Sequence, residues 1–162
     1  MPVRTIANAW IPVPDGCRLA ARIWLPDDAG DRPVPAVLDA VPYRKGDGTE
    51  ARDASRYPYI AGHGYGCVRL DLRGSGDSDG LIEDEYTEQE RDDIEAVIGW
   101  LAEQPWCTGA VGMIGVSWGG FAALQAAARA PAALRGVVAI HASEDRYEVR
   151  SGERVHLIGS LK

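Results

Sequence analysis

The chain has 162 residues, of which 46% are apolar and 25% are charged, and these proportions are typical of one soluble globular domain with a packed core. The formal net charge of −7 argues against nucleic acid as the main partner, because phosphate binding needs clustered Lys and Arg, which are scattered here. No apolar run is long enough to span a membrane, and the first residues lack a secretory signal pattern. We therefore expect a cytoplasmic protein without nucleic-acid or membrane partners.

The N-terminal part of the chain predicts mainly strands. Residues 4–13 and 17–26 show partial alternation of apolar and polar side chains on either side of a Pro-Asp-Gly turn, which predicts an antiparallel hairpin. A mostly apolar run, residues 34–43, then predicts a strand that ends near Tyr43. The polar segment after it contains a predicted helix, late in residues 44–62.

The pattern from residue 65 onward alternates between strands and helices. Residues 65–74 predict a strand, and Thr87 with Glu90 fits the capping box of a helix that Pro105 stops. Apolar residues recur at helical spacing within it: Ile94, Val97, Ile98 and Leu101.

A strand at 109–118, a small-residue helix at 119–130 and a last strand at 134–143 complete this alternation. Such an order implies parallel strands joined by helical crossovers, and therefore an α/β sheet.

The five residues Gly115 to Gly119 match the pattern G-x-S-x-G and stand between a predicted strand and a predicted helix. That context is typical of a nucleophile elbow, a tight turn that lifts a serine hydroxyl clear of the sheet. Glycine is required two residues on either side, since larger side chains would collide with neighbouring backbone. Ser117 is therefore the candidate nucleophile, and the backbone N–H of Trp118 is the first candidate donor to a developing oxyanion.

Two other polar patterns do not predict a ligand site. The Gly-rich segment 73–80 lacks the spacing of a dinucleotide loop, and we expect a tight polar loop braced by an ion pair between Asp71 and Arg73. The carboxylate clusters 83–85 and 92–93 have no adjacent His and predict a solvated acidic face. No cofactor and no metal are expected.

Several stretches together resemble the cocaine esterase and X-prolyl dipeptidyl-peptidase type of serine hydrolase. They are DLRGSGDSDG, VPYRK, WLAEQPWCTGAVGMIGVSWGG and ASEDRY, and the likeness runs from about Ile6 to Tyr147. The resemblance implies an α/β-hydrolase fold with a mostly parallel sheet, an N-terminal antiparallel hairpin and flanking helices. It also implies cleavage of small-molecule esters or amides through an acyl-serine, with the hydroxyl of Tyr43 as a second oxyanion donor.

The resemblance also implies that partners of the serine are missing. Family members place the acid and the His far downstream, beyond an inserted cap, whereas this chain ends soon after Ser117. We expect residues 1–147 to be the N-terminal part of a truncated hydrolase domain, and residues 148–162 to be a poorly ordered tail outside the family pattern. His141 is interpreted as an ordinary half-buried side chain rather than the catalytic base.

Truncation predicts an open, apolar sheet edge at residues 134–142 and self-association through it. The alternative function is an inactive remnant or a binding module that keeps the hydrolase fold without turnover. Substrate identity and the choice between ester and amide are not predicted.

Overall fold

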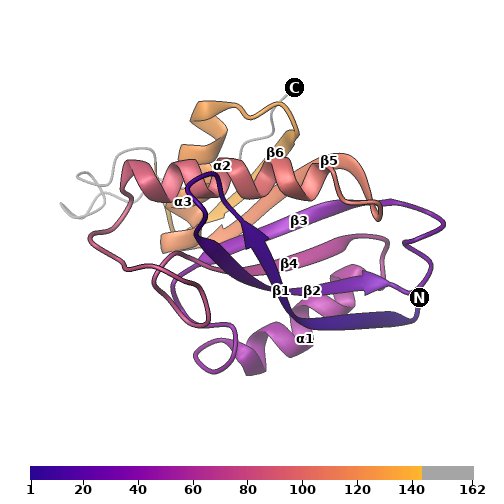
Figure 1. Cartoon of the computed structure of the whole chain (residues 1–162). Coiled ribbons are helices and arrows are strands. Elements are labelled where there is room, and N and C mark those ends of the chain that lie inside the picture. The colour runs from indigo at the N-terminus through magenta and orange to yellow at the C-terminus, as the bar shows by residue number, and fades with distance from the viewer. Residues whose placement is uncertain (144–162) are drawn as a thin grey trace.

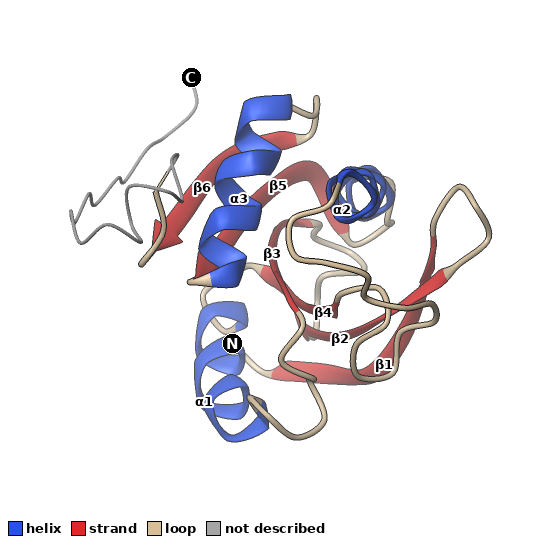
Figure 2. Ribbon diagram, turned by 90° about the vertical axis from the view of Figure 1, so that its left-hand side faces the viewer, coloured by secondary structure: helices blue, strands red, loops and turns tan. Residues whose placement is uncertain are grey.

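The computed structural model describes residues 1–143, which form a curved six-stranded sheet with helices on both faces (Figure 1; Figure 2). The strands are β1 (Val3–Pro12), β2 (Arg18–Pro26), β3 (Val34–Val41), β4 (Gly66–Asp71), β5 (Cys107–Val116) and β6 (Leu134–Ile140). The helices are α1 (Glu50–Ala61), α2 (Glu88–Ala102) and α3 (Trp118–Arg129).

The strands follow the order β1-β2-β4-β3-β5-β6. The predicted hairpin is confirmed, because β1 and β2 pair antiparallel. Strand β2 also pairs antiparallel with β4, whereas β4, β3, β5 and β6 are parallel neighbours. The α/β prediction is therefore confirmed. Within the described residues, no helix is long and apolar enough to cross a membrane.

Strand β3 is shorter than the predicted strand, since it ends at Val41 rather than near Tyr43. The next residue is Pro42, which has no backbone N–H for a ladder hydrogen bond. Tyr43 therefore stands in the loop just beyond the carboxyl end of β3.

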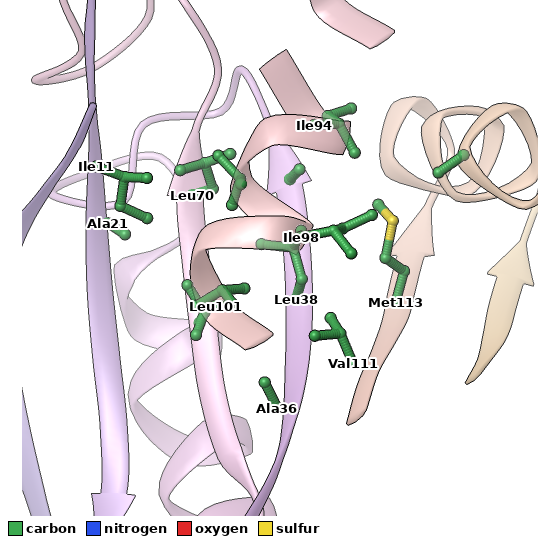
Figure 3. Close-up of a cluster of buried hydrophobic side chains, with 14 of the residues drawn as sticks. Ile11, Ala21, Ala36, Leu38, Leu70, Ile94, Ile98, Leu101, Val111 and Met113 are labelled. Carbon is green, nitrogen blue, oxygen red and sulfur yellow. The ribbon is translucent and has the colours of Figure 1, made fainter. Parts of the chain in front are cut away.

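The two faces of the sheet bury different clusters. Helices α2 and α3 contact each other and share the main core with β3, β5 and β6. Figure 3 shows Ile98 of α2 close to Leu38 of β3 and Met113 of β5, and Ile94 and Leu101 of the same helix belong to this core. Helix α1 covers the opposite face of β2 and β4, where Trp24, Tyr57, Ala61 and Cys67 form a smaller cluster.

The predicted start of α2 is confirmed, with one difference in the cap. Thr87 is the N-cap residue, and its Oγ1 accepts the N–H of Glu90 at 3.2 Å. The Glu90 carboxylate returns to the N–H of Tyr86 at 3.1 Å, one residue before the N-cap N–H that a capping box would use.

Candidate active site

Ser117 occupies a one-residue turn between β5, which ends at Val116, and α3, which begins at Trp118. Its backbone has φ 55° and ψ −115°, a region that costs a non-glycine residue free energy. Two backbone hydrogen bonds hold this conformation: the Ser117 N–H donates to the Ile140 carbonyl at 2.8 Å, and the Ser117 carbonyl accepts the Phe121 N–H at 3.0 Å. Ser117 is exposed. The sheet thus presents a strained serine to solvent.

The glycines around Ser117 are required because neighbouring backbone and side-chain atoms approach them closely. A Cβ on Gly115 would overlap the backbone carbonyl group of Gly119. A Cβ on Gly119 would lie 2.6 Å from Val41 Cγ1, and one on Gly120 would lie 2.9 Å from the carbonyl oxygen of Ile140. The first turn of α3 can therefore sit on the ends of β3 and β6 only with glycine at these positions.

Tyr43 lies at the same edge of the sheet as Ser117. Strands β3 and β5 are parallel neighbours with Leu38 opposite Met113, so their carboxyl ends are level. Tyr43 follows β3 by two residues, and its side chain is 39% exposed. The fold brings the candidate nucleophile and the candidate phenol donor to adjacent strand ends.

The side chain of Trp118 points toward the start of α2. Its Nε1 donates to Glu90 Oε1 at 2.9 Å, and its ring packs on Tyr86 with the centroids 5.0 Å apart. Burial of Glu90 raises the pKa of its carboxyl, although the Trp118 hydrogen bond opposes this shift. Trp118 lines a cleft of 410 Å³ that neither Ser117 nor Tyr43 lines.

Sequence reasoning missed Asp39, which is 2% exposed within β3. Its Oδ2 accepts the Tyr57 hydroxyl and lies 3.6 Å from Arg52, whereas its Oδ1 has no hydrogen-bond partner among the described residues. A Cβ on Gly119 would be 3.1 Å from that Oδ1, so the carboxyl lies directly beneath the first turn of α3. Burial raises the pKa of Asp39. A single Asp in an apolar strand was the available signal.

The ion pair expected between Asp71 and Arg73 is wrong. Asp71 pairs with Lys45, whose Nζ lies 3.5 Å from Asp71 Oδ2. Arg73 instead binds Asp93 at 2.7 Å and Asp15 at 2.9 Å. Strand β4 ends at Asp71, so Arg73 lies in the turn after it, where its side chain meets different neighbours.

The acidic cluster at 92–93 is solvated only in part. Asp92 is exposed and binds Arg129, as a solvated face predicts. Asp93 is 1% exposed and is neutralised by Arg73, so the expectation is wrong for this residue.

The histidines of the described residues lie at different ends of the fold. His63 is exposed near the end of α1, where its Nδ1 lies 2.8 Å from the Tyr59 carbonyl. His141 directly follows β6 with φ 53° and is exposed rather than half-buried, because the chain leaves the sheet there. His156 and the predicted boundary after residue 147 fall outside the described residues.

The sequence model of the X-Pro dipeptidyl-peptidase (S15) family matches residues 15–160. The chain belongs to this family. It is 34% identical over 142 residues to the cocaine esterase of Rhodococcus sp. (strain MB1 Bresler), covering 87% of this chain and 24% of that protein. It is 31% identical over 147 residues to a Xaa-Pro dipeptidyl-peptidase of Streptomyces avermitilis that is named as putative, covering 72% of this chain and 22% of that protein.

The fold of this S15-family chain matches solved hydrolase structures. A CocE/NonD family hydrolase from Staphylococcus aureus superposes with a TM-score of 0.73 at 24% identity, over 85% of this chain and 27% of that one. The α/β-hydrolase prediction is thereby confirmed. The chain spans about a quarter of the length of the relatives that it matches.

Proposed function

We propose that Ser117 is the nucleophile of an acyl-transfer reaction in which small-molecule esters or amides are cleaved through an acyl-serine. The observation that carries the proposal is the exposed Ser117 at φ 55°, between a buried strand and a helix N-terminus. A strained backbone at that point persists only when its surroundings hold it, and such strain is concentrated at functional sites. The membership of the S15 family supports the same chemistry.

In the proposed reaction, Ser117 Oγ attacks the substrate carbonyl carbon, and the carbonyl oxygen becomes an oxyanion. The Trp118 N–H belongs to the first turn of α3, whose N–H groups lack partners within the helix and whose dipole favours negative charge. The Tyr43 hydroxyl is the proposed second donor. Collapse of the tetrahedral intermediate breaks the bond to the leaving group, which takes up the proton lost by Ser117 and departs as the alcohol or amine. Water then hydrolyses the acyl-serine to the free acid and restores the serine hydroxyl.

The proposed Asp and His partners of Ser117 lie outside this chain, as the resemblance to longer hydrolases implies. A serine without a base is a weak nucleophile at neutral pH, and the oxyanion hole and binding alone leave about 10³–10⁴-fold acceleration over water. We therefore expect slow hydrolysis by the isolated chain.

A fluorophosphonate probe tests the nucleophile directly. We expect covalent labelling of Ser117 that is lost in Ser117→Ala and kept in Ser55→Ala, a matched change at an exposed helical serine. Hydrolysis of p-nitrophenyl acetate above the Ser117→Ala background would show that a base is supplied. Absence of labelling in the folded protein would favour the alternative, an inactive remnant or binding module.

We also propose that the chain self-associates through β6. Among the described strands β6 pairs only with β5, and Val138 and Ile140 on it are 41% and 38% exposed. An unpaired strand edge with apolar side chains is a template for pairing with another chain. Light scattering should show a species larger than the monomer, and Val138→Lys should reduce it; a monomer at all concentrations would contradict the proposal.

A further inference from the structure

The Gly-rich loop after β4 contributes no group to the proposed reaction, yet ionic contacts connect it to the segment that carries Tyr43. The joining residues are Asp71, the last residue of β4, and Lys45, which lies two residues after Tyr43. Asp71 is 0% exposed and Lys45 is 2% exposed, so both charges are buried. A buried ion pair is a costly feature whose geometry is held tightly once all its groups are partnered.

Both charged groups of this pair have partners. The Lys45 N–H donates to Asp71 Oδ1 at 2.7 Å, and the Lys45 Nζ contacts Asp71 Oδ2 at 3.5 Å and the Asp77 carboxylate. Asp71 Oδ2 also accepts the Asp77 N–H at 3.2 Å. A Cβ on Gly76 would overlap the Asp71 carboxylate, so glycine at this position allows the loop to close around it.

The backbone between Tyr43 and this pair has little freedom. Arg44 has φ 57°, a conformation that a side chain of this size adopts only when its surroundings impose it. The far end of the same segment is fixed separately, since Arg69 Nη2 donates to Thr49 Oγ1 at 3.2 Å. Within residues 1–143 the Tyr43 hydroxyl has no such anchor of its own, and Tyr43 is 39% exposed.

We propose that Lys45 and Asp71 are positioning residues that hold Tyr43 at the oxyanion site. The inference rests on the proposed function for the role of Tyr43, and the structure supplies the mechanical link. An oxyanion donor is effective only within about 3 Å of the developing charge, so an exposed phenol on a loop needs a rigid support. The Lys45 main chain, two residues away, is tied to the sheet by a charge-assisted hydrogen bond.

The first experiment follows Tyr43 without using activity. 3-Fluorotyrosine is placed at position 43 of the full chain, and its ¹⁹F resonance is recorded in the otherwise unaltered protein, in Lys45→Met and in Arg18→Met. Arg18 binds Asp79 of the same loop at 2.8 Å, and in the part of the chain that the structure describes it makes no hydrogen bond or ion pair with Lys45 or Asp71. We expect the resonance to move toward that of free fluorotyrosine in Lys45→Met and to stay in place in Arg18→Met.

Asp77→Asn provides a second variant if Lys45→Met does not fold. The Asp77 side chain is 63% exposed, so this change removes the negative charge beside Lys45 Nζ without opening the core. A smaller movement of the resonance in the same direction supports the proposal. An unchanged resonance in either folded variant overturns it, whether or not Ser117 reacts with a probe.

The second experiment separates positioning from general stability through the rate of Ser117 phosphonylation. Loss of one oxyanion donor typically costs about 10²–10³-fold, so Tyr43→Phe should lower the rate to that extent. Lys45→Met should lower it too, but should have no further effect in the Tyr43→Phe background, because Lys45 acts through the Tyr43 hydroxyl. If the double variant lost the product of the two single-variant factors in phosphonylation rate, the proposal would be overturned. A wild-type protein that is not labelled would refute the proposed function instead, and the ¹⁹F result would still decide the support role.

Discussion

The indole Nε1 of Trp118 donates a hydrogen bond to Glu90 Oε1 at 2.9 Å and thereby joins the first turn of α3 to the first turn of α2. Glu90 is bound on its other side as well, since its Oε2 accepts the Tyr86 N–H and its own N–H donates to Thr87. One carboxylate thus links the residue after the candidate nucleophile to the cap of a neighbouring helix. The support of the site extends beyond the elbow itself.

Replacement of Glu90 by Ala should destabilise the fold through this link. The change leaves the Trp118 Nε1 and the Tyr86 N–H without their acceptor, and lost hydrogen bonds of this kind cost about 1–2 kcal/mol in the free energy of unfolding. Urea denaturation followed by tryptophan fluorescence measures the loss. Glu90→Gln is the matched control, because its amide oxygen still accepts one of the two bonds, and it should lose less. Equal stability of Glu90→Ala and wild type would show that the link has no energetic role.

Gly115→Ala should be strongly unfavourable because its Cβ has no space. The new atom would overlap the Gly119 carbonyl group, and overpacking of this kind costs about 1–3 kcal/mol. Gly99→Ala is the matched change: Gly99 is exposed on α2 with nothing within 4 Å of a Cβ, and it should gain about 0.5–1 kcal/mol from helix propensity. The denaturant midpoints of both variants, compared with that of the wild type, measure these changes in stability. We expect the free energy of unfolding to fall in Gly115→Ala and to rise in Gly99→Ala. Unchanged stability of Gly115→Ala would mean that the turn at Ser117 has room for a Cβ.

The ionisation of Asp39 should make stability depend on pH. Burial raises the pKa of this carboxyl, while Arg69, the Tyr57 hydroxyl, Arg52 and Arg56 partly oppose the shift. A raised folded-state pKa means that the fold favours the neutral acid, so this contribution to stability is complete below the unfolded pKa of about 3.9 and is lost as the pH rises through the folded value.

Asp39→Asn removes this titration and isolates the effect. The free energy of unfolding of the Asn variant, relative to wild type, should be constant below about pH 3.9 and should increase in favour of Asn above it, until the folded pKa is passed. Urea titrations at a series of pH values measure this difference. A relative stability that falls with rising pH would show that the arginines outweigh burial.

The local parts of the fold were predictable from the amino-acid pattern. The hairpin of β1 and β2, the Thr87 cap and the alternation from β4 to β6 follow from turn residues, capping residues and hydrophobic period, which act over a few positions. The G-x-S-x-G pattern predicted a turn at Ser117, where the structure has a non-glycine residue at positive φ. Steric constraints between neighbouring residues can be predicted from the sequence, because they depend only on which residues are adjacent.

The pairing of charges was not predictable in the same way. Asp71 binds Lys45, 26 residues away, because β3 and β4 are neighbours in a sheet whose order departs from chain order. The position of Asp39 beneath the first turn of α3 likewise depends on how α3 packs on the end of β3. The chain alone determined the elements and the strained serine turn, since these depend on short-range sterics and periodicity, and its motifs carried the resemblance to the family. Tertiary structure decided which carboxylates are buried, which cations neutralise them and which loop carries Tyr43, because burial and ion pairing depend on contacts between segments that are distant in sequence.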